Sequence, residues 1–191
     1  MKYLVALGFL GMASAFQPES RNALKAAVDA CLLGTSGTGA ECYACDNGQI
    51  VASDAVCGDG NTPSFISDWD TSQVDSMYRI FFNRVNFNTD ISGWDVSSVT
   101  TFEEMFRIAS AFDQDLSCWD ISEATNFNQM FRQAPMSHTL CWDTGISDSD
   151  LYATTDSNPD TNTNCNQDCD AGGAGGDGDP CNPPPTDPAQ Y

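Results

Sequence analysis

Basic residues are scarce in this chain: seven Lys and Arg stand against 27 Asp and Glu in 191 residues, for a formal net charge of −20. That charge repels nucleic-acid phosphates and anionic membrane headgroups, so neither is an expected partner. Histidine is almost missing too, and no nucleophile motif surrounds the single one, His138. No Gly-rich phosphate loop follows a strand pattern. We therefore expect no cofactor, and we predict that the chain is not an enzyme.

Long hydrophobic runs are also lacking, which argues against a membrane span. The one notable apolar run, residues 3–12, follows Lys2 and is too short to cross a bilayer. Together with the small residues Ala13 and Ala15, it predicts a signal peptide over residues 1–15. Nine cysteines fit export to an oxidising compartment. We expect a secreted or cell-surface protein.

The end of this segment leaves a second destination open. The stretch "ASAFQP" resembles the cleavage motif of plastid presequences in diatoms and related algae, in which Phe follows the signal cleavage site and a basic, Ser-rich segment comes next. Phe16 matches, but the next thirty residues hold four acidic side chains and only two basic ones, Arg21 and Lys25. Transit segments are poor in acidic residues, so the charge favours secretion over plastid import.

One phrase is repeated along the middle of the chain. Its four tryptophans stand at the nearly evenly spaced positions 69, 94, 119 and 142, and Asp follows each of them. Phenylalanines recur at one later position of three successive units. A fixed period of this length is typical of stacked repeats, in which one unit cannot bury its own apolar face. The predicted repeat core comprises Trp69, Trp94, Trp119, Trp142, Phe81, Phe106 and Phe131.

Two periodicities inside each unit predict its local structure. Ile91, Trp94 and Val96 have the spacing of a leucine-rich-repeat strand, with inward residues two apart. Apolar residues at positions 102, 105 and 106 then stand at i, i+3 and i+4, which is typical of one face of a short helix. We therefore predict a leucine-rich-repeat-like solenoid of about three to four coils, with short parallel strands and short helices.

The combined phrase "WDVSSVTTFEEMFRIASAFDQDLSCWDIS" resembles the repeat of BspA-type surface proteins, a leucine-rich-repeat-like group of mycoplasma, other bacteria and protists, including marine algae. The resemblance covers residues 65–144 and implies a secreted or surface protein associated with adhesion or recognition. The group has no shared enzymatic activity to carry over. The third unit departs from the pattern after Phe131, where Pro135 replaces the expected Phe.

Four segments are predicted. Residues 1–15 form the signal peptide, and residues 16–60 form an N-terminal capping helix with a cysteine-containing loop. Ser20 can cap that helix and Gly34 can end it. Residues 61–145 form the BspA-like repeats. The tail over residues 146–191, rich in Asp, Asn, Gly and Pro, lacks the apolar area to fold and is expected to be disordered.

The cysteines predict structural disulfides. Cys118 and Cys141 each precede a repeat Trp, and equivalent strand positions on neighbouring coils are roughly 4.7–4.9 Å apart. This spacing suits a disulfide, so we predict a Cys118–Cys141 bond. Among the others, two bonds are expected within one set, whose pairing the spacing leaves open: Cys31, Cys42, Cys45 and Cys57. Zinc would require a second ligand pair at a spacing similar to that of Cys42 and Cys45.

The aspartates that follow the tryptophans, Asp70, Asp95 and Asp120, point outward from the predicted sheet, one above another. In one interpretation each accepts hydrogen bonds from its own turn, helped by the Ser two residues on. In the other they form a partner face, either a calcium-bound ladder or a surface for a basic or polyhydroxylated ligand. The tail is richer in oxygen ligands and is compatible with weak calcium binding, but it matches no EF-hand spacing.

The sequence thus predicts a secreted or cell-surface repeat protein that acts as a non-catalytic binding or adhesion module. Its expected partner is an extracellular protein or glycan. The alternative is a secreted acidic structural protein, associated with cations or mineral, in which the repeats support the acidic tail. Cys42 and Cys45 have a redox or zinc spacing on their own but lack a second ligand pair, and no acidic cluster has the ordered spacing of an EF-hand.

Overall fold

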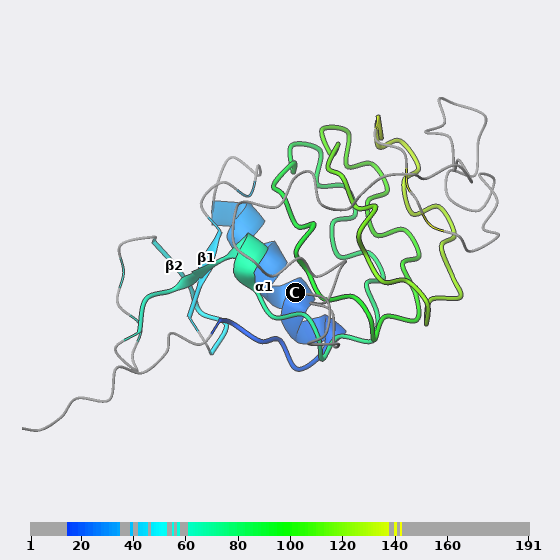
Figure 1. Ribbon diagram of the computed structural model, residues 1–191. Coiled ribbons are helices and arrows are strands. Elements are labelled where there is room, and N and C mark those ends of the chain that lie inside the picture. Colours follow the sequence, from blue (N-terminus) through cyan, green and yellow to red (C-terminus); the bar gives the residue numbers. More distant parts are fainter. Residues whose placement is uncertain are drawn as a thin grey trace, which may run out of the picture.

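A computed structural model describes residues 15–34, 39, 42–45, 47–52, 55, 57, 61–137, 140 and 142. Several predictions of the sequence lie outside these residues: most of the signal peptide, the disorder and weak calcium binding of the tail, the role of His138, and the Cys118–Cys141 bond, since Cys141 is not described. The described chain begins with one helix and a small sheet, and the repeats follow them (Figure 1).

The helix α1 spans Arg21–Gly34. Ser20 lies directly before it, and its hydroxyl oxygen accepts the Ala23 N–H at 3.3 Å, which satisfies one of the unpaired donors of the first turn. The apolar side chains Leu24, Val28 and Cys31 are fully buried. They lie at i, i+4 and i+7, so the helix buries one face.

A three-stranded antiparallel sheet follows α1, in the order β2-β1-β3. Its strands are short: β1 is Tyr43–Ala44, β2 is Ile50–Val51 and β3 is Ser64–Phe65. A single 3₁₀ turn, η1 (Ile66–Asp68), leads from β3 into the first repeat. Disulfides join Cys31 to Cys42 and Cys45 to Cys57, with Cα atoms 5.4 and 5.6 Å apart. The first bond links α1 to the residue before β1.

The predicted leucine-rich-repeat-like solenoid of parallel strands and short helices is wrong. Among the described residues, α1 is the one α-helix, and the one sheet is small, antiparallel and placed before the repeats. The repeat region consists of turns. Strand-type pairing in the described part of the repeats is limited to two isolated parallel bridges, Ser76 with Thr101 and Thr101 with Asn126. Successive units nevertheless pack side by side, with residues at equivalent repeat positions paired.

The predicted short helices fail because of left-handed backbone positions. Glu104 and Ile108 have φ of 53° and 63°, and positive φ recurs at the equivalent positions of the units before and after, at Arg79, Asn83, Gln129 and Gln133. A right-handed helix cannot continue through such residues. The N–H groups of Phe102, Glu104 and Phe106 instead donate to carbonyl oxygens of the following unit at 2.8–2.9 Å. The backbone N–H groups of this stretch therefore bond to the next unit and not within a helix. The i, i+3, i+4 spacing comes from a series of consecutive turns over residues 102–108 and the equivalent residues of the other units, which we call the ribbon of turns.

The predicted short strands fail for a related reason. The N–H of Trp94 donates to the carbonyl of Ile91 at 3.0 Å, and the N–H of Val99 donates to that of Val96 at 2.9 Å. Bonds between residues three apart close tight turns. The stretch that has leucine-rich-repeat spacing is therefore folded on itself, and its apolar side chains reach the interior from turns.

The interior of the repeats is built from aligned aromatic rings. Phe81, Phe106 and Phe131 form a column with successive centroids 5.5 Å apart and ring planes within 4° of parallel. A second column joins Phe87 to Phe112 at 5.9 Å. The column phenylalanines are fully buried, and the four repeat tryptophans are 2–9% exposed. Aromatic rings at equivalent positions of successive units therefore shield one another from solvent, as the repeat period predicts.

The tryptophans also join each unit to the one before it. The indole N–H of Trp94 donates to the carbonyl oxygen of Ile66 at 2.8 Å, and that of Trp119 donates to Ile91 at 3.3 Å. Trp142 donates to Leu116 at 3.1 Å in the same way. In the first unit, Trp69 donates to the carbonyl of Ser64 in β3 at 3.2 Å. Each buried indole is thus satisfied by a backbone carbonyl, which for Trp94, Trp119 and Trp142 belongs to the preceding unit.

Candidate interaction surface

The predicted partner face, Asp70, Asp95 and Asp120, is made of turn-capping residues. In each case one carboxylate oxygen accepts the N–H of the Ser two residues later, at 3.1, 3.0 and 3.1 Å. This is the geometry of an Asx turn, in which a side chain satisfies a local backbone donor. The hydrogen bonds from the Ser122 side chain and backbone hold the pKa of Asp120 below its ordinary value. Asp95 and Asp120 remain exposed.

Two other aspartates form the same kind of Asx turn at another position of the unit. Asp90 accepts the Ser92 N–H at 2.9 Å, and Asp115 accepts the Ser117 N–H at 3.0 Å. Within the part of the chain that the structure describes, no three His, Cys, Asp or Glu side chains are grouped to hold a metal ion. The structure therefore gives the Asp row a local backbone partner and brings no further acidic ligand to it in that region.

A different surface collects cationic and aromatic side chains. We call it the arginine–aromatic ridge, and it comprises Arg21, Tyr78, Arg79, Phe82 and Arg107. The guanidinium carbons of Arg21 and Arg79 lie 5.5 and 4.9 Å from the Tyr78 ring centroid. Those of Arg79 and Arg107 lie 5.0 and 5.6 Å from the Phe82 centroid. Guanidinium groups at this distance are attracted to the ring faces. The ridge thus alternates cations and rings from α1 across two repeat units.

Glu104 forms ion pairs with two arginines of the ridge. Its carboxylate oxygen Oε2 accepts from Arg79 Nε at 2.8 Å and from Arg107 Nη1 at 3.0 Å. The Glu104 side chain is only 9% exposed, whereas that of Arg79 is 40% exposed. The hydrogen bond from Arg79 and then the one from Arg107 lower the pKa of Glu104 below its ordinary value, against an opposing effect of burial. The same contact raises the pKa of Arg79.

The lowered pKa of Glu104 predicts a pH-dependent contribution to stability. A carboxyl with a depressed folded-state pKa stabilises the fold above its unfolded pKa, about 4.3, and loses this effect as the pH falls through the folded value. Glu104→Gln should lower the free energy of unfolding by about 1–2 kcal/mol at pH 7, and the difference from wild type should shrink between about pH 5 and 3. Urea unfolding at several pH values measures both effects.

The surrounding chain offers a good comparison for that variant. Gln129 occupies the equivalent position one unit later with φ 56°, so glutamine is compatible with the left-handed backbone at 104, where φ is 53°. Glu123→Gln, at an exposed position, is the control and should leave stability unchanged within about 0.5 kcal/mol at every pH. A constant Glu104→Gln difference from pH 7 to 3 would contradict the role of the ionised carboxylate.

The ridge was missed at the sequence level, although the sequence holds a signal for it. The stretch that follows the first buried Met or Phe of each unit contains four arginines in three successive units: Arg79, Arg84, Arg107 and Arg132. Arg107 and Arg132 occupy the same repeat position as Phe82. Arg84 pairs with Asp29 of α1, and Arg132 donates to Gln129 at 2.9 Å. Basic residues thus gather on the ribbon of turns, while aspartates occupy the other turns of each unit. Aligning the units and comparing the charged residues at each repeat position would have shown that arginines and aspartates lie on different turns.

These observations define a disulfide-bonded repeat protein whose similar, successive units pack behind an N-terminal helix and sheet. Residues 55–157 match the family described as "Mycoplasma protein of unknown function, DUF285". Because the match spans more than half of the 191 residues, the chain belongs to this family. No curated protein and no solved structure matches the chain. In the described part of the chain, no helix has the length and apolar character needed to cross a membrane.

Proposed function

We propose that the chain is a secreted or cell-surface, non-catalytic binding module of the BspA type, and that the arginine–aromatic ridge is its contact surface. The expected partner is an extracellular protein or glycan. The observation that carries the proposal is the ridge itself, because it gathers two rings and three guanidinium groups on one face of a chain with a net charge of −20.

The composition of the ridge supports a role in recognition. Arg and Tyr are enriched at the energetically important centres of protein interfaces, because they combine apolar area with hydrogen-bonding groups. Tyr78, Phe82 and Arg107 are half-buried, so each side chain is held by its surroundings while part of it faces solvent. Ion pairs to Glu104 and the backbone ladder between units further restrict the ridge. A rigid contact surface loses little conformational entropy on binding.

The chemistry of the ridge also indicates what it would bind. Guanidinium groups pair with carboxylate, sulfate or phosphate oxygens in a planar, two-point geometry. Aromatic faces supply stacking area beside them. An acidic glycan or an acidic segment of a surface protein satisfies both demands. The remaining negative charge of the chain would discourage long-range capture of polyanions, so recognition depends on close contact at the ridge.

Binding of the secreted full-length protein to immobilised acidic and neutral glycans, and to intact cells that produce it, tests this proposal. The variant with Arg79→Gln and Phe82→Ala should bind at least tenfold more weakly, after circular dichroism and thermal melting establish that it is folded. The control carries Asp95→Asn and Asp120→Asn on the Asp row and should bind like wild type. A folded ridge variant with unchanged affinity would refute the proposal, and loss of binding in the control alone would assign the contact to the Asp row.

A further inference from the structure

Phe16 is a buried residue at the start of the described chain. Its side chain is 4% exposed, and its ring meets that of Trp69 edge to face, with centroids 5.1 Å apart and planes at 89°. On another side it lies against Gly48, where an added Cβ would stand 3.0 Å from Phe16 Cε2. Gly48 also has φ of 79°, so a larger residue there would be both strained and crowded. The fold therefore encloses this one ring closely.

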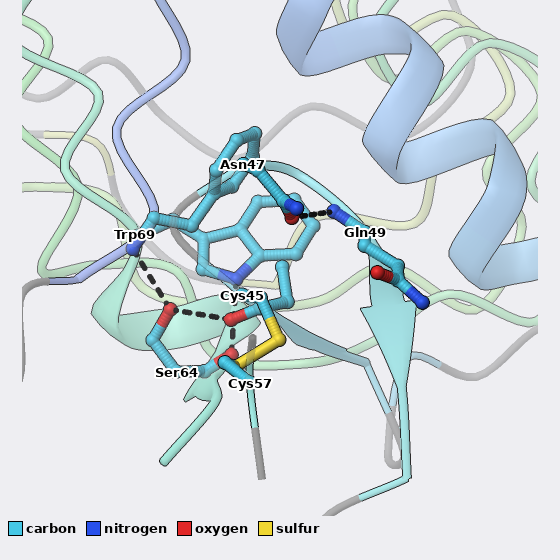
Figure 2. Close-up of a disulfide and its surroundings, with 8 residues drawn as sticks. Cys45, Asn47, Gln49, Cys57, Ser64 and Trp69 are labelled. Carbon is cyan, nitrogen blue, oxygen red and sulfur yellow. Dashed lines mark hydrogen bonds between the residues drawn. A yellow bond between two sulfur atoms is a disulfide. The ribbon is translucent and has the colours of Figure 1, made fainter. Parts of the chain in front are cut away.

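The backbone of Phe16 is bonded on both sides. Its N–H donates to Ser64 Oγ at 2.9 Å, and its carbonyl oxygen accepts the Asp70 N–H at 3.0 Å. Ser64 in turn donates to the carbonyl of Ala44 in β1 at 3.3 Å. Ser64 lies beside Trp69 and the Cys45–Cys57 disulfide (Figure 2). Phe16 is thus joined to the sheet and to the first repeat at once.

The residues after Phe16 belong to the same core. Pro18 is buried, Leu24 and Val28 of α1 are fully buried, and Cys31 is bonded to Cys42. Removal of this segment would expose the first repeat and break a disulfide. Ala15 is half-buried, and Phe16 is the first buried residue of the described chain. The tightly packed part of the described chain therefore begins at Phe16, one residue after the small pair Ala13 and Ala15 that suits signal cleavage.

We propose that the Ala15–Phe16 peptide bond is the processing site of this chain, and that Phe16 is the N-terminal residue of the mature protein, held between Gly48, Ser64 and Trp69. Hydrolysis breaks the C–N bond: water supplies a hydroxyl to the Ala15 carbonyl carbon and a hydrogen to the Phe16 nitrogen. The new amine takes up a proton from solvent, since its ordinary pKa is about 7.7–8.0. The resulting ammonium is still a donor, so the bond to Ser64 is retained.

This assignment separates the two destinations that the sequence leaves open. A route that removes a transit segment after Phe16 would delete α1 and the Cys31–Cys42 bond, which are parts of the fold. A single cut before Phe16 leaves α1 and both disulfides in place. The inference favours export over plastid import and does not depend on which partner the ridge binds.

The test is to express the full-length chain through a eukaryotic secretory pathway and to determine the mature N-terminus by mass spectrometry. The expected N-terminus is Phe16, and folded protein should resist an aminopeptidase that digests it once it is unfolded. An N-terminus at any residue after Phe16, or an uncut chain, would overturn the proposal. Rapid removal of Phe16 from folded protein would overturn the buried position of the new terminus.

A pair of variants tests the role of the ring. Phe16→Ala leaves both small residues in place and should be cut at the same bond, but its melting temperature should fall by about 10 °C because a buried aromatic ring is lost. Glu19→Ala, at an exposed position of the same segment, should melt like wild type. Equal melting temperatures for Phe16→Ala and wild type would show that the ring does not secure the terminus. If Phe16→Ala fails to fold, the mature N-terminus and aminopeptidase resistance of wild type decide the matter.

Discussion

Phe106→Ala is expected to lower the free energy of unfolding by about 3–5 kcal/mol, the largest effect of any single substitution considered for this chain. Phe106 is fully buried, and its ring lies 5.5 Å from both Phe81 and Phe131 and 3.9 Å from Phe112. Truncation removes the middle ring of the column. The backbone bonds between units hold the rings on either side apart, so the cavity cannot collapse and its full cost remains.

Urea unfolding followed by tryptophan fluorescence measures this loss. Phe106→Leu keeps most of the volume and should cost clearly less. Val85→Ala is the control, because Val85 is 43% exposed, and it should change stability by less than about 0.5 kcal/mol. A loss below about 1.5 kcal/mol for Phe106→Ala would mean that the units move together to fill the space, and that the column is softer than its ring alignment indicates.

Replacing both Cys31 and Cys42 with Ala is the second large change, with an expected loss of about 2–4 kcal/mol. The two residues are 11 apart in sequence and fully buried, and their bond links α1 to the residue before β1. Without it the unfolded chain gains conformational freedom, and α1 keeps only its packing and its surface contacts, such as Arg21 with the Tyr78 carbonyl. Amide hydrogen exchange over residues 21–34 should accelerate more than exchange over the repeats.

The second disulfide provides a matched comparison. Cys45 and Cys57 are 12 apart in sequence, so breaking their bond releases nearly the same chain entropy, but it leaves α1 attached. The Cys45→Ala, Cys57→Ala variant should therefore lose similar stability without selective exchange in α1. Equal exchange of α1 in the two variants would show that packing alone holds the helix in place.

Some of the fold was predictable because burial follows from composition and period. The helix over residues 21–34 begins directly after Ser20, whose hydroxyl oxygen accepts a first-turn N–H, and ends at Gly34, as the sequence predicts. The repeated aromatic residues are buried whatever the backbone between them does, because the hydrophobic effect has no direction. The Asx turns at Asp95 and Asp120 involve residues two apart, so one of the two sequence interpretations already described them.

The local structure of the units could not be predicted in the same way. Left-handed positions are normally marked by Gly or Asn, but among those of the repeats only Asn83 is of this kind, and the others are Arg79, Glu104, Ile108, Gln129 and Gln133. Nothing in those residue types indicates positive φ, and what stabilises it is the backbone bonding to the next unit, a non-local effect. The apolar residues at 102, 105 and 106 therefore have helical spacing although the backbone there is not helical. The ridge was missed for a similar reason, since Arg21 of α1 meets Tyr78 only in the folded chain.

The indole bonds give the array of units a direction. Every repeat tryptophan donates to a carbonyl earlier in the chain, and Trp69 finds its acceptor five residues before it, in β3. The carbonyl of Ser64 in β3 is therefore the first acceptor of the series, and each unit supplies an acceptor carbonyl for the indole of the next unit. A unit inserted between two others would find an acceptor in the unit before it and offer one to the unit after it, so the array can lengthen in the middle without changes in the sheet.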